Sequence, residues 1–181
     1  MESSRNPGRV RVRRTPPPTL TAEQIDRVIA TANANPRLRL TGAVVRVLSE
    51  TGLRTSELLR LRMGDVDFNN NRLFVSGSKT AGRYIPLTPQ ALSALQDLHS
   101  LFLGSDLVMG DTAVRTLSGV SENFRKITAQ HGIVGQGLFS LRLFYVKHLF
   151  ECGVNVVSVA RSIGMSHPER TLRLYWKYGL R

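Results

Sequence analysis

The chain has one cysteine, one tryptophan and only 13 acidic residues, against 25 lysines and arginines. A single cysteine excludes an internal disulfide and any zinc site built from several cysteines. There is no run of 18 apolar residues and no lipidation motif, so the sequence predicts no membrane partner. The shortage of acids leaves a formal net charge of +12, which indicates a polyanionic partner.

Enough apolar residues are present for one folded core, since 41% of the 181 residues are hydrophobic. Residues 1–19 differ from the rest, because they are basic and rich in proline. We predict a flexible basic arm or linker over 1–19 and one folded domain over 20–181. Four arginines of the arm are expected to contact DNA phosphates: Arg9, Arg11, Arg13 and Arg14. A disordered end without a function is the alternative.

Apolar periodicity predicts an α+β domain that is mainly helical, with one small antiparallel sheet. Thr21 and Gln24 fit a capping box at the start of the first helix. Thr88 is expected to cap another helix, with Pro89 in its first turn. Cys152 falls in a helical apolar pattern, which favours a small core residue over a nucleophile.

Three segments combine this framework with exposed cations. Residues 51–67 place Arg54 at a turn between two apolar helices, where Gly52 can end the first helix and Thr55 or Ser56 can cap the second. Arg54 is therefore expected to face outward. Residues 73–87 are typical of two short strands around a Ser-Lys-Thr turn, and residues 138–153 of a helix that ends at a glycine.

The same three segments, in this order, resemble the signature boxes of the tyrosine recombinases, or phage integrase family. The first is similar to the T-G-L-R-x-S-E-L turn that supplies a phosphate-binding arginine. The second resembles the hairpin of the catalytic lysine, and the third resembles the H-x-L-R-H helix with the second arginine. The resemblance covers about residues 20–178 and implies the fold of the family's catalytic domain.

This resemblance implies breakage and rejoining of double-stranded DNA without a metal or another cofactor. A tyrosine hydroxyl would attack a phosphate and leave a 3′-phosphotyrosyl link and a free 5′-hydroxyl. Arg54 and Arg142 would bind the non-bridging oxygens, so both are expected to point to a phosphate rather than to the core. Lys79 would protonate the leaving 5′ oxygen. Arg83 and Lys147 are expected as further DNA contacts.

Two positions depart from the family pattern. Phe139 stands three residues before Arg142, where the family has a histidine, and a phenyl ring cannot exchange protons. Met165 stands where the family's L-G-H turn has its histidine. His167, two residues later, is the candidate for the missing acid-base group, and an exposed histidine at a helix start is the alternative.

The predicted nucleophile is Tyr175. It ends a run that resembles the P-E-x-T-L-R-x-Y ending of family members with a longer turn before the tyrosine helix. Tyr178 lies on the same helix face and is the second candidate. A packing role beside Trp176 is the alternative for Tyr175.

The sequence therefore predicts the catalytic domain of a site-specific recombinase or integrase, as mobile elements use. We expect it in the cytoplasm, encoded by a bacterium, an archaeon or a phage, with protomers that assemble on DNA. The family's N-terminal DNA-clamping domain has no counterpart in residues 1–19, which fits either an excised catalytic domain or a naturally short recombinase.

Two alternatives stay open. One is a degenerate family member that binds DNA without cleaving it. The other is a simple basic helical module that binds nucleic acid. Type IB topoisomerases use similar chemistry, but a chain of this length lacks room for their clamp.

Overall fold

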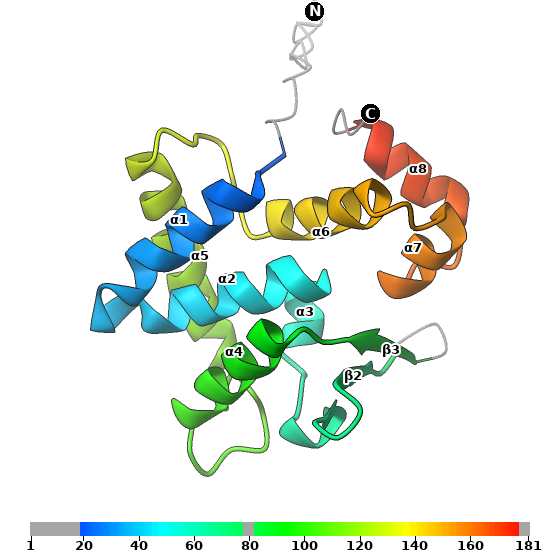
Figure 1. The fold of residues 1–181 in the computed structure, drawn as a ribbon. Helices are drawn as coiled ribbons and strands as arrows, with labels where there is room; N and C mark the ends of the chain where they lie inside the picture. Colours follow the sequence, from blue (N-terminus) through cyan, green and yellow to red (C-terminus); the bar gives the residue numbers. More distant parts are fainter. Residues whose placement is uncertain (1–18, 78–81, 178–181) are drawn as a thin grey trace, which may run out of the picture.

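The computed structural model describes residues 19–77 and 82–177, of which residue 172 and residues 174–177 are described by their backbone alone. The elements run in the following order (Figure 1): α1 Ala22–Asn33, η1 Pro36–Leu38, α2 Arg39–Thr51, α3 Thr55–Leu58, η2 Met63–Asp65, β1 Val66–Asp67, β2 Arg72–Val75, β3 Arg83–Pro86, α4 Pro89–Ser100, α5 Ala113–Gln130, α6 Phe139–Glu151, α7 Val156–Ser162 and α8 Pro168–Lys177. The predicted mainly helical class with one small antiparallel sheet is confirmed.

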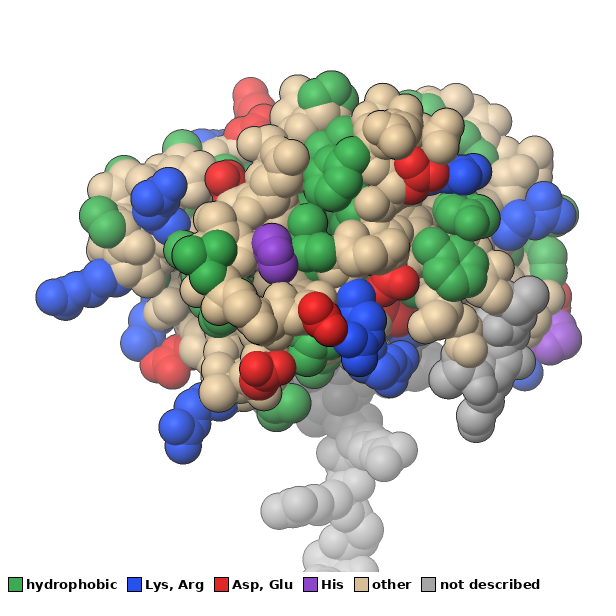
Figure 2. Space-filling model, turned by 90° about the horizontal axis from the view of Figure 1, so that it is seen from below, with side chains coloured by type: hydrophobic (Ala, Val, Ile, Leu, Met, Phe, Trp, Pro, Cys, Tyr) green, Lys and Arg blue, Asp and Glu red, His purple; other side chains and the backbone are tan. Residues whose placement is uncertain are grey.

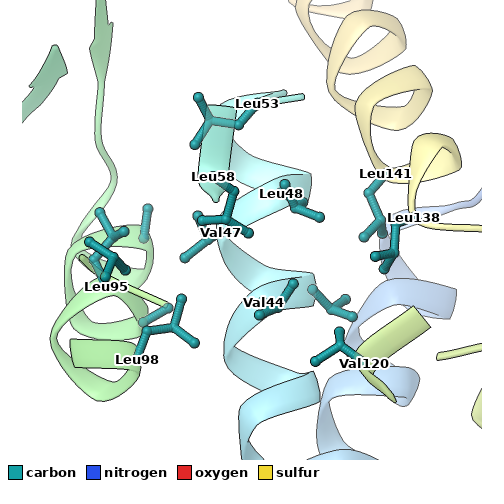
Figure 3. Close-up of a cluster of buried hydrophobic side chains, with 14 of the residues drawn as sticks. Val44, Val47, Leu48, Leu53, Leu58, Leu95, Leu98, Val120, Leu138 and Leu141 are labelled. Carbon is teal, nitrogen blue, oxygen red and sulfur yellow. The ribbon is translucent and has the colours of Figure 1, made fainter. Parts of the chain in front are cut away.

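Helix α2 is the centre of the domain and packs against α1, α4, α5 and α6. Its buried residues lie on several sides of the helix, because neighbours cover it nearly all round. Figure 3 shows Val44, Val47 and Leu48 of α2 among leucines from α4 on one side and from α6 and its N-cap on the other. Such an enclosed helix can hold the turn that follows it, which carries Arg54, in a fixed place.

The three strands form one antiparallel sheet in the order β1-β2-β3. In the β2–β3 pair, Leu73 is opposite Ile85 and Val75 is opposite Arg83. Leu73 and Ile85 are both fully buried and attach the sheet to the core. Residues 78–81, which include Lys79, connect these two strands and lie outside the described residues.

Helices α7 and α8 form a C-terminal unit beside the end of α6 and next to β3 (Figure 1). A small apolar cluster of four buried residues belongs to this part of the molecule: Tyr145, Val146, Val159 and Ile163. It is separate from the main core around α2. The C-terminal unit is thus attached to the body by a limited apolar contact.

Local sequence signals are reproduced at two helix starts. Thr21 and Gln24 form the predicted capping box of α1, and Thr88 accepts the Ala91 N–H at the start of α4. The prediction for Cys152 is wrong, because this residue caps the end of α6 and is exposed. None of the helices within residues 19–77 and 82–177 combines the length and the apolar character needed to cross a membrane.

Candidate functional site

The turn between α2 and α3 presents Arg54 at the surface and buries its neighbours. Gly52 ends α2 with a φ of 62°, a left-handed conformation that a residue without a Cβ adopts readily. Leu53 and Leu58 are 2% and 0% exposed and fix the turn to the core. The Arg54 side chain is 41% exposed, so the prediction that it faces outward is confirmed.

Arg142, on α6, is held against the same turn but from inside. It is 4% exposed. Its Nη1 donates to the Gly52 carbonyl at 2.5 Å and its Nη2 to the Ile163 carbonyl at 2.6 Å. The side chain is thus buried in the structure without DNA, where its guanidinium donates to two backbone carbonyls inside the fold, and its expected phosphate contact stays a prediction.

Tyr145 joins the turn, α6 and α7. A Cβ added to Gly52 would lie 2.3 Å from Cδ1 of Tyr145, so the close approach of the ring requires a glycine. The Tyr145 hydroxyl lies 2.9 Å from Oγ of Ser162. Burial raises the pKa of Tyr145 above its ordinary value, which keeps the hydroxyl neutral. Its contacts are those of a packing residue that aligns the three segments.

Glu57 is the anion at the centre of the site, and its side chain is 7% exposed. Its Oε2 accepts the backbone N–H of Arg54 at 2.8 Å, and its Oε1 accepts Nη1 of Arg54 at 2.8 Å. Arg54, rather than Thr55 or Ser56, is therefore the N-cap residue of α3. Arg83 donates to both oxygens, from Nη1 to Oε1 at 3.0 Å and from Nη2 to Oε2 at 2.9 Å.

The ionised form of Glu57 is strongly favoured. Burial alone raises the pKa of Glu57, but hydrogen bonds from Arg83 and from the Arg54 backbone, with the charges of both guanidinium groups, outweigh it and lower the pKa to about 2. Glu57 is thus a permanent anion at neutral pH. It can orient the two arginines continuously.

Three successive carbonyls at the C-terminal end of α7 each accept a hydrogen bond from a different arginine. Ser162 O accepts from Nε of Arg83 at 2.8 Å, and Gly164 O accepts from Nη2 of Arg54 at 3.0 Å. Between them, Ile163 O accepts from Arg142. The end of a helix leaves carbonyls without partners and carries partial negative charge, which suits cations. The three guanidinium groups are thereby gathered at one turn.

The gathered cations leave the site positive. Burial lowers the pKa of Arg142 to about 10, and the nearby charges of Arg54 and Arg83 act in the same direction. Arg142 is still charged at neutral pH. Three guanidinium groups around one carboxylate give a cluster with an excess of positive charge. Such a cluster is chemically suited to bind a phosphate or another oxyanion.

Several predicted site residues lie outside the described part of the chain. They are the arm residues Arg9, Arg11, Arg13 and Arg14, the hairpin residue Lys79, and Tyr178. Tyr175 lies on α8, and only its backbone is described. Helix α8 packs against α7 and α6. Tyr175 therefore belongs to the C-terminal unit, in which the end of α7 binds the arginine cluster.

Two predicted site residues pair with acids instead of joining the cluster. His167 precedes α8 with its side chain 53% exposed, and its Nδ1 lies 3.4 Å from Oε1 of Glu169. Lys147, on α6, lies 3.4 Å from Glu151 one turn later. Among residues 19–77 and 82–177, no hydrogen bond or ion pair joins either side chain to the arginine cluster.

The two positions that depart from the family pattern differ in their surroundings. Phe139 is the first residue of α6 and is 49% exposed. Met165 packs against the small apolar cluster, and its sulfur accepts the hydroxyl of Thr171 at 3.5 Å. Met165 therefore links the turn after α7 to α8.

Arg83 is predicted as a DNA contact, but its side chain is only 8% exposed. Both its Nη atoms are bonded to the carboxylate of Glu57, which neutralises its charge, whereas the Nη donors of Arg142 bind neutral carbonyls, so a phosphate contact by Arg83 does not fit this geometry. A DNA-binding face is also not marked by charge in the view of Figure 2, where basic and acidic side chains are interspersed.

The fold is that of a tyrosine-recombinase catalytic domain. The pattern that describes the phage integrase family matches residues 18–178. The chain belongs to the phage integrase family, and the resemblance of its sequence boxes is confirmed.

Similar sequences are recombinases of bacteria. A tyrosine recombinase of Thermosipho africanus is 31% identical over an alignment 182 residues long with its gaps. The alignment covers 94% of this chain and 60% of that protein. The tyrosine recombinase XerC of Chlamydia caviae is 27% identical over 173 residues, or 86% of this chain and 53% of that protein. The chain thus spans little more than half the length of these curated relatives.

Similar solved structures share the fold at low identity. The XerA recombinase matches with a TM-score of 0.72 and 20% identity, over 91% of this chain and 65% of that one. The integrase of transposon Tn1549, in complex with a circular intermediate DNA, matches with a TM-score of 0.75 and 18% identity, over 87% of this chain and 61% of that one.

Sequence reasoning missed the partners that hold the arginines. Glu57 is visible in the first box, and its place three residues after Arg54 could have indicated a helix-capping carboxylate. The carbonyls of Ser162 and Gly164 carry no side-chain signal at all. Only the fold brings them to arginines that are 79 and 110 residues away in sequence.

Proposed function

We propose that this chain is the catalytic domain of a site-specific recombinase or integrase that cuts and rejoins double-stranded DNA. The observation that carries the proposal is the pair Arg54 and Arg142, whose guanidinium groups bind the consecutive carbonyls of Gly164 and Ile163. These carbonyls are neutral, so a charged phosphate can replace them as the partner, and two cations this close together can then hold its non-bridging oxygens. Removing one such preorganised donor typically lowers a rate by about 10²–10³-fold.

The chemical step is an in-line displacement at phosphorus. The hydroxyl of Tyr175 attacks, its oxygen bonds to phosphorus, and the bond from phosphorus to the 5′ oxygen breaks. The proton of the tyrosine leaves to a base, and the 5′ oxygen takes a proton from Lys79. His167 is the candidate acid-base group in place of the histidine that Phe139 replaces. Attack by a 5′-hydroxyl on the phosphotyrosyl link reverses these steps and joins the strands.

The partner in this proposal is duplex DNA, bound through phosphate contacts. The basic arm over 1–19 and Lys147 would add contacts outside the cluster. Assembly of several protomers on DNA and action in the cytoplasm of a bacterial cell are part of the proposal. The bacterial sources of the similar proteins support the last point.

Salt dependence tests the contribution of the arm. Each arginine that neutralises a phosphate adds about −0.9 to the slope of log affinity against log salt. Deleting residues 1–14 should therefore make the slope shallower in a fluorescence-anisotropy titration on duplex DNA. An unchanged slope would show that the arm does not contact DNA.

A DNA-binding protein without cleavage is the second candidate. Phe139 is the reason to test it, because a phenyl ring occupies the family's histidine position and cannot transfer protons. This candidate keeps the phosphate contacts of Arg54 and Arg142 and predicts no covalent intermediate. Cleavage and binding must therefore be measured separately.

Covalent trapping separates the two. A pool of nicked duplexes with randomised sequence is incubated with the protein, because a nick lets the cut fragment leave and prevents rejoining. The proposal expects a denaturation-resistant protein–DNA adduct with the unmutated protein, none with Tyr175→Phe, and an undiminished one with Tyr178→Phe. DNA binding without any adduct would favour the second candidate.

Arginine variants complete this test. Arg54→Ala and Arg142→Lys should each lower the adduct rate by about 100-fold or more. Arg115→Ala, at an exposed position on α5, is the matched control and should leave the rate unchanged. Arg142→Lys is preferred to alanine, since alanine would leave two buried carbonyls without a donor.

A further inference from the structure

Arg83 is the third cation of the cluster, and the phosphate chemistry described above gives it no task. It is the first residue of β3, where the strand leaves the hairpin that contains Lys79. A buried arginine is uncommon unless its charge is paired. Its side chain is 8% exposed and is therefore enclosed by protein.

The contacts of Arg83 join three separate segments. Two parallel hydrogen bonds, at 3.0 and 2.9 Å, connect its Nη atoms to the two carboxylate oxygens of Glu57 beside α3. Its Nε donates at 2.8 Å to the Ser162 carbonyl at the end of α7. Only a planar fork with three donor atoms can make this set of bonds, and a lysine ammonium cannot reproduce it.

Through Glu57, Arg83 also determines where Arg54 lies. Oε1 of Glu57 is shared, since it accepts Nη1 of Arg83 at 3.0 Å and Nη1 of Arg54 at 2.8 Å. The bidentate pair fixes the plane of the carboxylate, and the carboxylate in turn fixes one end of the Arg54 guanidinium. Without Arg83, the carboxylate of Glu57 would be free to rotate. The Arg54 guanidinium that it holds would then move away from Arg142.

Gly164 gives an independent sign that the two arginines are closely placed. A Cβ added to Gly164 would lie 2.6 Å from Nη1 of Arg83 and 3.3 Å from Nη1 of Arg54. Both guanidinium groups therefore lie directly against the backbone of the turn after α7. A shift of Arg83 would change the space available to Arg54.

We propose that Arg83 is a positioning residue for DNA cleavage, acting through Glu57 on Arg54 and tying the base of the Lys79 hairpin to the end of α7. This inference rests on the proposed function. It replaces the expectation that Arg83 contacts DNA. Its consequence is that loss of Arg83 slows the chemical step and leaves DNA affinity nearly unchanged.

The central test is Arg83→Lys, which keeps the positive charge and removes the fork. With saturating nicked DNA, the rate of adduct formation should fall by about 10- to 100-fold, the loss expected from a small misplacement of a reacting group. The dissociation constant should stay within about twofold, because no DNA contact is removed. A role as a DNA contact would give the reverse pattern, and that result would overturn the proposal.

Arg72→Lys is the matched control. Arg72 lies on the neighbouring strand β2 and is also ion-paired, with its Nε 2.9 Å from Asp67, but its side chain is 43% exposed. This variant should keep both the rate and the affinity. An equal loss of rate in the two variants would mean that any disturbance of the hairpin slows cleavage, which contradicts a specific role for Arg83.

A double-mutant cycle tests the route through Glu57. If Arg83 acts by holding this carboxylate, Glu57→Gln and Arg83→Lys together should lower the rate scarcely more than the more severe single change. Rate losses that multiply independently would overturn this route. A thermal melt of each variant shows whether the protein is folded, and Arg83→Gln serves if Arg83→Lys is unfolded.

A readout without catalysis separates this inference from the proposed function. The Nε–H proton of Arg54 can be followed by NMR in protein without DNA, and Arg83→Lys should shift it and speed its exchange with water, whereas Arg72→Lys should not. If no adduct forms with unmutated protein but this signal changes, the proposed function fails, while the placement of Arg54 by Arg83 stands. An unchanged signal overturns the positioning role, whether or not an adduct forms.

Discussion

The helical body around α2 and the C-terminal unit of α7 and α8 are held in the fold by different kinds of interaction. The body has a large apolar core that extends from α1 to α6 and includes the sheet. The C-terminal unit has a small apolar cluster of four buried residues. Its remaining attachment is polar and includes the three arginines that bind the end of α7 and the hydrogen bond between Tyr145 and Ser162.

Under the proposed function, this difference separates a scaffold from a part that would respond to DNA. Apolar contacts of the body offer nothing to a phosphate. The bonds from Arg54 and Arg142 to peptide carbonyls use donors that a charged phosphate oxygen binds more strongly. Under the proposed function, a DNA phosphate would compete for the donors that attach the unit carrying Tyr175, while the body keeps the arginines in place.

The largest expected effect is in the body. Leu48→Ala should lower the free energy of unfolding by about 3–4 kcal/mol, because it removes a fully enclosed side chain and leaves a cavity. Urea denaturation measures this loss. Leu103→Ala, at a side chain that is 84% exposed, is the control and should change stability by less than about 0.5 kcal/mol. Similar losses in both variants would mean that Leu48 is not part of a tightly packed core.

Acid titration sharpens the comparison at the polar attachment. Folding lowers the pKa of Glu57 from 4.5 to about 2, so its stabilising contribution is complete above pH 4.5 and is lost as the pH falls towards 2. The loss should be on the order of 2–3 kcal/mol. Glu57→Gln should lack this component of the pH dependence. An acid profile identical to that of unmutated protein would show that Glu57 is not held as an anion.

A smaller effect is expected at the turn after α7. Gly164→Ala should cost about 1–2 kcal/mol, because the residue has a φ of +65° and its new Cβ would press on Arg83 and Arg54. It should also slow adduct formation, although no charge is removed. Gly153 has a φ of +77° and nothing lies within 4 Å of an added Cβ. Gly153→Ala should therefore lower stability only through the strained backbone conformation, without a steric contact. Equal cleavage rates in the two variants would contradict the close packing of the arginines on this turn.

Local signals in the sequence were sufficient to predict several helix starts and ends of the helical body. The caps at Thr21 and Thr88 depend on residues within one helical turn, and Gly52 at the end of α2 depends on its own backbone conformation. These features are decided by neighbours in the chain. They could be predicted without the fold.

The polar attachment could not be predicted, because its parts are far apart in sequence. Arg83 and Glu57 are 26 residues apart, and the carbonyl partner of Arg54 is 110 residues away. Backbone carbonyls have no residue identity that a motif could record. Arg142 was correctly placed on its helix, but the burial of its side chain follows from tertiary packing alone.

The central claim, that the arginine cluster activates a DNA phosphate for attack by a tyrosine of α8, is tested most directly by mapping the covalent bond. Unmutated protein is trapped on the nicked duplex pool, digested with nuclease and protease, and analysed by tandem mass spectrometry. We predict a nucleotide joined through its 3′-phosphate to the hydroxyl of Tyr175. A nucleotide on Tyr178, on another residue, or on no residue while DNA remains bound would contradict the claim.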